Sequence, residues 1–239
     1  MGVVEEKSGD GWEGGAVKLE APNLTGQFTV IDAPQRSQEW FAARLGRLTS
    51  SRAADILATL KSGGEAAGRR NYRMQLALER VTGKSQERGY VNQAMQDGID
   101  REPDAYAAYE ALTGSILTRT GFCQHTTLMA GCALDGHAGD FEGLIEIKCP
   151  MPATHWEYLK SGRVPGDYLQ QITHALWITG AQWCDWMSFH PDFPESLQAK
   201  IVRVPRDENA IAIYQSYAVK FLEEVETECN AIRTLAGVA

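Results

Sequence analysis

The sequence predicts an α/β protein of the α+β sandwich type, in which a central sheet of mixed topology is flanked by helices. Three observations favour this class. Segments with helical periodicity dominate the first half of the chain, short β-rich segments between glycines or polar turns follow, and helical patterns then return around two further strands. A chain of 239 residues with 44% hydrophobic residues is long enough to bury one substantial core.

Residues 1–24 are expected to form a flexible arm, because they are rich in glycine and acidic residues and show no periodicity. Residues 25–239 are assigned to a single domain. No apolar run is long enough to span a bilayer, and the N-terminus lacks the pattern of a signal peptide. The five cysteines are scattered without a C-x-x-C pair, so we expect reduced thiols in a cytoplasmic protein.

Four helices are expected before the β-rich region, over residues 37–46, 49–64, 71–83 and 101–114. The first has Ser37 as its candidate N-cap and Gly46 as the residue that ends it, and Gly114 ends the fourth. In the third, Met74 and Leu78 recur at helical spacing and are predicted to face the core.

The β-rich region is expected to contain a meander of about four strands, over residues 115–120, 122–127, 128–134 and 143–149. A helix follows over residues 167–180, and two more strands are expected over 183–190 and 199–206. A long amphipathic helix closes the chain. Its buried stripe is predicted to contain Ile211, Tyr214, Ala218, Phe221, Val225, Cys229 and Ile232.

The net charge of −8 disfavours a protein that coats nucleic acid through a broad basic surface. It does not disfavour an enzyme that acts on nucleic acid, because metal-binding carboxylates add to the acidity and a local basic patch can coexist with a negative total. Candidate chemistry is therefore sought in small clusters of residues.

Asp135, Glu146 and Lys148 form the cluster with the clearest chemistry. Glu146 and Lys148 are two positions apart in an expected strand and share a face, while Ile147 between them faces the apolar packing. A hairpin through residues 136–143 would bring Asp135, which lies in a glycine-containing turn, beside Glu146. Two carboxylates and a backbone carbonyl, for instance that of Ile147, suit Mg²⁺ or Mn²⁺. Lys148 can orient or deprotonate an attacking water and offset charge on a phosphate.

This cluster predicts a divalent-metal site that cleaves phosphodiester bonds. The structural alternative is an exposed Glu–Lys pair on an edge strand and an unrelated turn aspartate. A pattern as short as D-x(n)-E-x-K occurs by accident, so the spacing alone favours that alternative. The metal site therefore depends on whether further residues converge on the same place.

Glu102 is a third candidate acid. At about 100° per residue it falls within the buried arc of a helix, which is predicted to contain Ile99, Ala105, Tyr106, Tyr109 and Leu112. A carboxylate on a buried side needs an ion pair or a metal ion. Pro103 leaves a structural alternative open, because a helix that starts or kinks there would make Glu102 an N-cap.

Arg44 and the hydroxyl cluster of residues 49–51 predict an anion site, because free N–H groups at a helix N-terminus and an arginine one turn earlier attract phosphate. Ser51 is the favoured hydroxyl, and Thr49 and Ser50 are the alternatives. Simple capping beside a surface arginine is the structural alternative.

Gln171 lies at the edge of an apolar helix stripe, where it could hold the nucleophilic water or Lys148. Gln170 is the alternative on the same helix, and most helix glutamines are merely solvated. The five histidines are isolated from one another, without a partner at i+3 or i+4, so we do not expect them to be metal ligands.

Four segments of the chain, in this order, resemble the phage lambda-type exonucleases, also called YqaJ-type viral recombinases, of the PD-(D/E)-x-K nuclease superfamily. They are EWFAARLGRLTSSRAADIL, GIDREPDAYAAYEALTG, LDGHAGDFEGLIEIKCP and YLQQITHALWITG. The resemblance runs from about Trp40 to Phe189 and implies a restriction-endonuclease-like core in a single exonuclease domain. Four ordered motifs are far more specific than E-x-K alone.

The resemblance implies a Mg²⁺-dependent 5′-to-3′ exonuclease, with Mn²⁺ as a substitute metal. Such an enzyme acts on linear double-stranded DNA, releases mononucleotides and leaves 3′ single-stranded DNA for recombination by strand annealing. The implied partners are a single-strand annealing protein and further copies of the chain in a ring-shaped homotrimer. The implied location is the cytoplasm of a bacterial host cell, with a phage or prophage as one source of the gene.

The site residues of the family carry over by position. Its catalytic positions fall on Lys148, Glu146, Asp135, Glu102 and Gln171, and the implied metal ligands are the three acids and the backbone carbonyl of Ile147. Arg44 and Ser51 fall where the family holds the 5′-phosphate of the shortened strand. The family pattern S-P-D-G is replaced here by Ala133, Leu134, Asp135 and Gly136, so one phosphate contact is missing and the strength of the 5′-phosphate preference is left open.

Two other functions stay open from the sequence. One is an endonuclease of restriction or structure-specific type on the same fold, and the other is a non-catalytic DNA-binding module. The intact set of Asp135, Glu146 and Lys148 argues against the second. A covalently closed circular duplex separates the first from an exonuclease, which needs an end.

Overall fold

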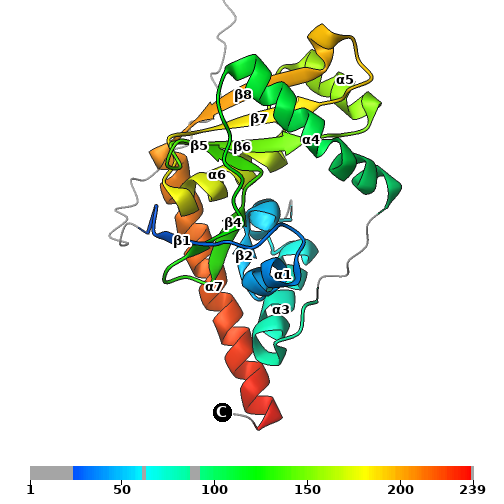
Figure 1. Ribbon diagram of the computed structural model, residues 1–239. Helices are drawn as coiled ribbons and strands as arrows, with labels where there is room; N and C mark the ends of the chain where they lie inside the picture. Colours follow the sequence, from blue (N-terminus) through cyan, green and yellow to red (C-terminus); the bar gives the residue numbers. More distant parts are fainter. Residues whose placement is uncertain (1–23, 61–62, 87–91, 238–239) are drawn as a thin grey trace, which may run out of the picture.

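The structure, a computed structural model, describes residues 24–60, 63–86 and 92–237. The arm expected over residues 1–24 lies outside them except for Leu24. In the described part of the chain, two four-stranded sheets are packed among helices (Figure 1). The predicted mixed α/β class with flanking helices is confirmed.

The first sheet has the strand order β1-β3-β4-β2. Its strands are β1 (Phe28–Ile31), β2 (Leu48–Thr49), β3 (Phe122–His125) and β4 (Ala130–Ala133). β2 runs parallel to β4, whereas β3 is antiparallel to both of its neighbours. This sheet brings the N-terminal hydroxyl cluster next to the strand that leads into the candidate metal site.

The second sheet has the strand order β5-β6-β7-β8. Its strands are β5 (Gly136–Ala138), β6 (Gly143–Lys148), β7 (Trp183–Phe189) and β8 (Ala199–Pro205). β6 and β7 are parallel and are joined through helices, as a parallel pair requires, while the two outer pairs are antiparallel. The chain passes from the first sheet to the second at Leu134 and Asp135. The sequence predicts one central sheet, and the structure divides it at this junction.

Helices cover both faces of the second sheet. The helices of the described residues are α1 (Gln38–Arg44), α2 (Ala53–Leu57), α3 (Ala67–Thr82), α4 (Gln93–Thr113), α5 (Pro152–Ser161), α6 (Gly166–Thr179) and α7 (Glu208–Ala236), with the 3₁₀ turns η1 (Ser50–Arg52) and η2 (Glu195–Leu197). On one face, Ala105 and Tyr109 of α4 pack with Ile145 and Ile147. Leu144 belongs instead to the core that α6 shares (Figure 1). Alternate residues of β6 therefore face opposite layers, as the sequence predicts.

The closing helix α7 is the longest in the described residues and lies along α3 and α6 (Figure 1). Its predicted stripe is confirmed: Ile211, Tyr214, Ala218, Phe221, Val225 and Cys229 are buried, and Ile232 is partly buried against the same core. The Asp207 side chain caps its N-terminus by accepting two backbone N–H groups. Among the described residues, none of the helices has the length and apolar content needed to cross a membrane.

Some local predictions are wrong. The helix expected over residues 49–64 is replaced by β2, η1 and the short α2, and Leu60 beyond it is exposed. Residues 115–120 form no strand apart from a bridge between Thr118 and His137. Met74 is exposed because α3 turns Tyr72 and Leu76 toward the core. In each case tertiary packing overrides a short local pattern.

Candidate active site

The β5–β6 hairpin places the two candidate metal ligands side by side. Gly136 pairs with Ile145, so the next pair in the antiparallel register brings Asp135 opposite Glu146. Glu146 is buried within β6, whereas Asp135 precedes β5 in the junction between the two sheets. The hairpin therefore unites the two carboxylates that the sequence assigns to one site.

Glu146 is held by two neighbours. Lys148 lies on the same face of β6 and forms an ion pair with Glu146 Oε1. Gln171 on α6 donates from Nε2 to the same oxygen at 2.6 Å. Gln170 lines a different pocket, beside α2 and α7. Of the two glutamines that the sequence offers, Gln171 is the one that contacts a carboxylate of this site.

Lys148 keeps its proton in this arrangement. Burial lowers the pKa of its ammonium group, but the charges of Glu146 and Asp135 outweigh burial and hold that pKa above its ordinary value. The Tyr168 ring centroid lies 4.9 Å from Nζ and adds a cation–π contact. Lys148 is thus available as a cation and a hydrogen-bond donor rather than as a base.

Asp135 is poised between a carboxylic acid and a carboxylate. Burial and the charge of Glu146 raise the pKa of Asp135 to about 7, although Lys148 and a backbone hydrogen bond oppose this shift. That bond runs from the Ile147 N–H to Asp135 Oδ2 at 2.6 Å. Because the N–H and C=O groups of a strand residue leave from the same edge, the Ile147 carbonyl also lies on the Asp135 side of β6.

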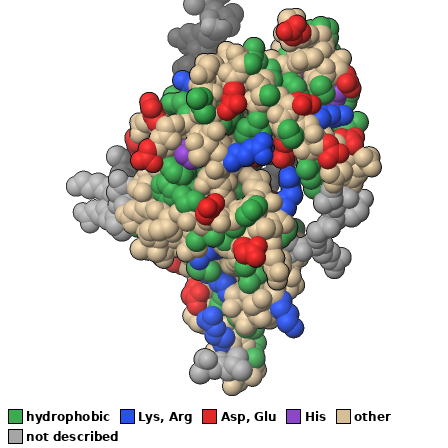
Figure 2. All heavy atoms as spheres, viewed as in Figure 1, with side chains coloured by type: hydrophobic (Ala, Val, Ile, Leu, Met, Phe, Trp, Pro, Cys, Tyr) green, Lys and Arg blue, Asp and Glu red, His purple; other side chains and the backbone are tan. Residues whose placement is uncertain are grey.

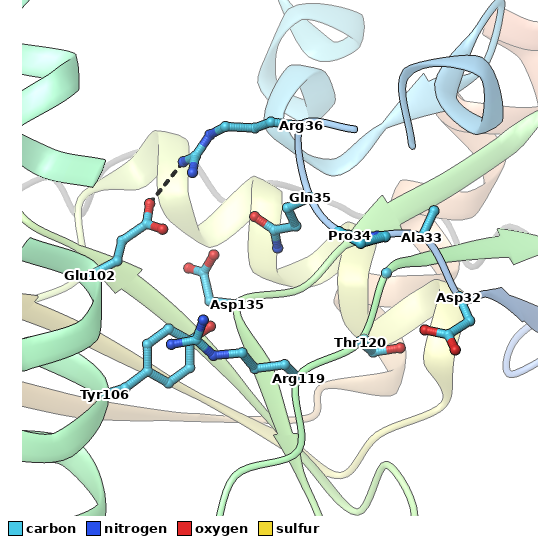
Figure 3. A pocket seen from close by; sticks show the side chains of 11 residues that line it. Asp32, Ala33, Pro34, Gln35, Arg36, Glu102, Tyr106, Arg119, Thr120 and Asp135 are labelled. Carbon is cyan, nitrogen blue, oxygen red and sulfur yellow. Dashed lines mark hydrogen bonds and ion pairs between the residues drawn. The ribbon is translucent and has the colours of Figure 1, made fainter. Parts of the chain in front are cut away.

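Glu102 reaches the site from α4. Its Oε1 forms an ion pair with Arg36 Nη2 at 2.9 Å, and Figure 3 shows the pair above Asp135. Asn92 is the N-cap of α4, so the alternative of Glu102 as an N-cap is wrong. Arg36 has a φ of 68°, which is unusual for a residue other than glycine and typical of functional positions.

A pocket of about 240 Å³ brings all the sequence-predicted site residues together. Its lining contains Asp135, Glu146, Ile147, Lys148, Glu102, Gln171, Arg44 and Ser51. The guanidinium carbon of Arg44 lies 4.2 Å from the centroid of the Trp40 ring. Ser51 is exposed on η1, whereas Thr49 and Ser50 are buried, so Ser51 is the hydroxyl most open to a ligand.

The donor set of this pocket fits a hard divalent cation. The carboxylates of Asp135 and Glu146 and the Ile147 carbonyl are oxygen ligands of the kind that Mg²⁺ and Mn²⁺ prefer. Across the described ranges, no group of three or more His, Cys, Asp and Glu side chains is placed to hold an ion. Glu102 is turned toward Arg36. An ion here would therefore take a ligand from the backbone, or from Glu102 after Arg36 releases it.

The profile of the YqaJ-like viral recombinase domain matches residues 39–182, which include every site residue that the sequence predicts. The chain belongs to the YqaJ-like viral recombinase family. The resemblance seen in the four sequence motifs is thereby confirmed. Comparison with curated proteins gave no match.

Solved structures support membership of the YqaJ-like family. The alkaline exonuclease LHK-Exo of Laribacter hongkongensis is 40% identical with a TM-score of 0.76. LHK-Exo in complex with dAMP gives 39% identity and a TM-score of 0.77, and both comparisons cover 84% of this chain and 98% of the other. A phage-related exonuclease from Haemophilus somnus is 13% identical, with a TM-score of 0.61 over 78% of this chain and 96% of the other, and it shares the fold alone.

Several residues of this YqaJ-like site escape sequence reasoning. Tyr168 lies three positions before Gln171 on α6, and that spacing is a signal that could have found it. Tyr106 is assigned by its periodicity to the buried arc of α4, yet it lines a pocket that adjoins the active-site pocket. Gln35 and Arg36 belong to a loop whose conformation no sequence pattern specifies.

Proposed function

We propose that this YqaJ-like protein is a Mg²⁺-dependent 5′-to-3′ exonuclease on linear double-stranded DNA. It releases mononucleotides and leaves 3′ single-stranded DNA for recombination by strand annealing. The observation that carries the proposal is the shared pocket, in which the Asp135–Glu146–Lys148 cluster lies beside Arg44 and Ser51. The similarity to an alkaline exonuclease over most of the chain supports the same reaction class.

The ion would be held by the carboxylates of Asp135 and Glu146 and by the Ile147 carbonyl, with Glu102 as a further ligand. A bound Mg²⁺ supplies Lewis-acid polarisation of the phosphoryl oxygen and lowers the pKa of a bound water. Gln171 fixes the Glu146 carboxylate by donating to Oε1. A hydrogen bond of this kind fixes the orientation of a ligating carboxylate toward the ion.

Lys148 acts as the catalytic lysine in this proposal. Its pKa is held above the ordinary value by Glu146 and Asp135 despite burial, so its ammonium group offsets the charge that builds up on the phosphate and orients the attacking water. The alternative in which Lys148 removes a proton from the water is disfavoured by the same pKa direction.

Arg44 and Ser51 bind the 5′-terminal phosphate in this proposal. The guanidinium group of Arg44 is packed on the ring of Trp40, and both residues line the pocket. Ala133 takes the place of the family serine and lines the pocket, so this turn supplies no hydroxyl to the phosphate. We expect a preference for 5′-phosphate that rests on arginine and one serine.

The proposed assembly is a ring-shaped homotrimer that encircles the duplex and works with a single-strand annealing protein. The family relationship supports this part of the proposal. Head-to-tail contacts between identical subunits form a closed ring only when the rotation from one subunit to the next divides a full turn evenly. Measuring the mass of the protein in solution tests whether the assembly is a trimer.

Digestion of three DNA substrates tests the proposed function. We expect rapid, Mg²⁺-dependent release of mononucleotides from linear duplex with 5′-phosphate ends, slower release with 5′-hydroxyl ends, and none from a covalently closed circle. Cleavage of the circle would favour the alternative endonuclease. Failure to bind Mg²⁺ in calorimetry would favour the alternative of a non-catalytic DNA-binding module.

A lysine substitution ties the reaction to the site. Lys148→Ala is expected to leave DNA binding largely intact and to abolish nucleotide release, because the transition-state charge loses its cation. Lys160→Ala is the matched control, since Lys160 lies on α5, outside the pocket, and pairs with Glu157. Full activity of Lys148→Ala would remove the lysine from the mechanism.

A further inference from the structure

A second pocket, of about 410 Å³, adjoins the active-site pocket. The two pockets share four lining residues, Gln35, Arg36, Glu102 and Asp135. They therefore adjoin along these residues, and the two pockets together are called the groove below. Arg44 and Ser51 line the active-site pocket. Arg119 and Tyr106 line the second pocket, which Figure 3 shows.

Arg119 is a cation of the second pocket that the proposed reaction does not yet use. It lies in the loop between α4 and β3, is exposed, and places its guanidinium carbon 4.0 Å from the centroid of the Tyr106 ring. Within the described part of the chain, no ion pair or side-chain hydrogen bond engages this guanidinium group. A guanidinium group stacked on an aromatic ring is pre-oriented and keeps its fork of N–H donors for an anion.

The acids of the second pocket do not neutralise Arg119. Glu102 is paired with Arg36, and Asp135 is the carboxylate that faces Ile147 and Glu146. Asp32 lies at the far end of the pocket from Arg119 (Figure 3). The groove thus presents an uncompensated guanidinium group in the pocket that Arg44 does not line.

We infer that Arg119, stacked on Tyr106, is a phosphate subsite for the backbone linkage between the second and third nucleotides of the shortened strand. This inference rests on the proposed function for its register along the DNA. Arg44 and Ser51 hold the terminal phosphate, and the carboxylates and Lys148 act on the first linkage. The strand then continues into the part of the groove where Arg119 lies.

The chemical role of Arg119 is positioning. A phosphate held on each side of the reacting linkage fixes that linkage over the carboxylates, and such orientation lowers the entropic part of the barrier. Phosphate contacts carry no base information. The subsite is therefore expected to act on every DNA sequence alike and to weaken with rising salt concentration.

Removing one charge from the DNA tests the subsite. Binding of a 5′-phosphorylated duplex is measured by fluorescence anisotropy in EDTA, with all phosphates intact or with a neutral methylphosphonate at the second linkage. Arg119→Gln is expected to weaken binding of the intact duplex about tenfold, as loss of a charged hydrogen-bond pair does. The methylphosphonate should weaken the wild type by a similar factor, and the two changes together should weaken binding no further.

Arg70→Gln is the matched control, because Arg70 is an exposed arginine on α3 that lines neither pocket. It should leave binding unchanged and the methylphosphonate effect intact. Arg119→Lys should fall between wild type and Arg119→Gln, because it keeps the charge and loses the fork. Unchanged thermal unfolding of each variant shows that the fold is intact.

The outcomes separate this inference from the proposed function. If Arg119→Gln and the methylphosphonate weaken DNA binding independently, so that their factors multiply, the subsite is overturned even if the wild type degrades linear DNA. A wild type that releases no nucleotides would overturn the exonuclease proposal, while non-additive binding effects would still support the subsite. The subsite would also be overturned if Arg119→Gln changed only the inhibition by free mononucleotide, while the methylphosphonate at the second linkage had no effect on binding.

Discussion

Gln171 and Gln170 are neighbours on α6 whose side chains line different pockets. Gln171 donates to Glu146, the acid that also carries the ion pair with Lys148. In the proposed mechanism its role is therefore to orient a metal ligand rather than to touch the substrate. Outer hydrogen bonds of this kind control metal affinity as well as activity.

Gln171→Ala is expected to lower the affinity for Mg²⁺ by about 10- to 100-fold, because Glu146 loses the donor that fixes its carboxylate. Isothermal titration calorimetry of the ion alone measures this without reference to activity. Gln170→Ala is the matched control and should retain the wild-type affinity. Equal affinities in the two variants would show that the hydrogen bond has no such role.

The pKa of Asp135 predicts how Mg²⁺ binding depends on pH. Burial and Glu146 raise this pKa to about 7, so the carboxyl group is mostly protonated at pH 6 and mostly ionised at pH 8. In the proposed site the ion binds the ionised carboxylate, so the apparent affinity for Mg²⁺ should rise about tenfold between those pH values. Calorimetry at pH 6 in buffers of different ionisation heat should detect release of a proton. Affinity that does not change with pH would contradict the prediction.

At the residue scale, the sequence predicts the acids and the lysine because strand alternation and a hairpin place side chains reliably. It leaves Gln170 and Gln171 open, because adjacent helix residues point about 100° apart and the sequence does not say which side of the stripe faces the site. Arg36 could not be predicted: its ion pair with Glu102 spans 66 residues and its backbone adopts a positive φ. Contacts of that range arise only after the whole chain has folded.

At the scale of elements, long periodic segments are predicted best. α7 buries the predicted stripe, and β6 presents the expected faces. α4 buries Ala105 and Tyr109 as predicted, but the prediction that Leu112 shares their buried arc is wrong, because Leu112 is exposed near the C-terminal end of the helix. Short elements are missed, because a few β-rich residues fit a strand, a bridge or a loop equally well. Residues 115–120 make a single bridge, and β1 is found only by its pairing with β3.

Gly121 shows why the pairing of β1 tolerates little change. A Cβ atom added there would stand 2.2 Å from the Ile31 carbonyl oxygen and 2.7 Å from backbone atoms of Ala33. Gly121→Ala is expected to cost about 2–4 kcal/mol of unfolding free energy, because backbone rather than a flexible side chain must move. Urea unfolding measures the change.

Gly166→Ala is the control for that substitution. Its Cβ would meet nothing within 4 Å, and the position lies in the first turn of α6. We expect unchanged or slightly increased stability, since alanine favours helix. A similar loss in both variants would mean that the close approach at Gly121 does not decide the result.

At the scale of the whole molecule, His174 joins three layers. It lies on α6, its Nε2–H donates to the Gly131 carbonyl of β4 at 3.0 Å, and its Nδ1 accepts from the Tyr214 hydroxyl of α7 at 2.7 Å. Burial lowers the pKa of His174 to about 3 from an ordinary value of 6.5, so the buried ring is neutral.

The linkage between this pKa and folding has a definite sign. The unfolded chain binds a proton at His174 more readily than the folded one, so stability is full above pH 6.5 and is lost as pH falls toward 3. Between pH 7 and 5 this one group should remove about 2 kcal/mol. Urea unfolding of wild type and His174→Gln at both pH values isolates it. A variant with the same pH dependence as the wild type would contradict the assignment.

The fold class and the family follow from the sequence at this scale, because four ordered motifs span most of the domain. The division into two sheets does not, since strand periodicity says which side chains share a face and not which strands pair. The proposed ring could not be predicted from the hydrophobic pattern or the charge either, because an interface between copies of a chain resembles the rest of the surface in composition.

The passage of the chain between its sheets at Leu134 and Asp135 has a mechanical consequence. Asp135 follows the last strand of the first sheet, and Glu146 lies in the second sheet. An ion bound by both carboxylates would therefore cross-link the two sheets. A ligand that binds the native state alone adds to its stability. Bound Mg²⁺ would then slow amide hydrogen exchange at the junction between the sheets. Its removal would lower the stability of the fold as well as stop the proposed reaction.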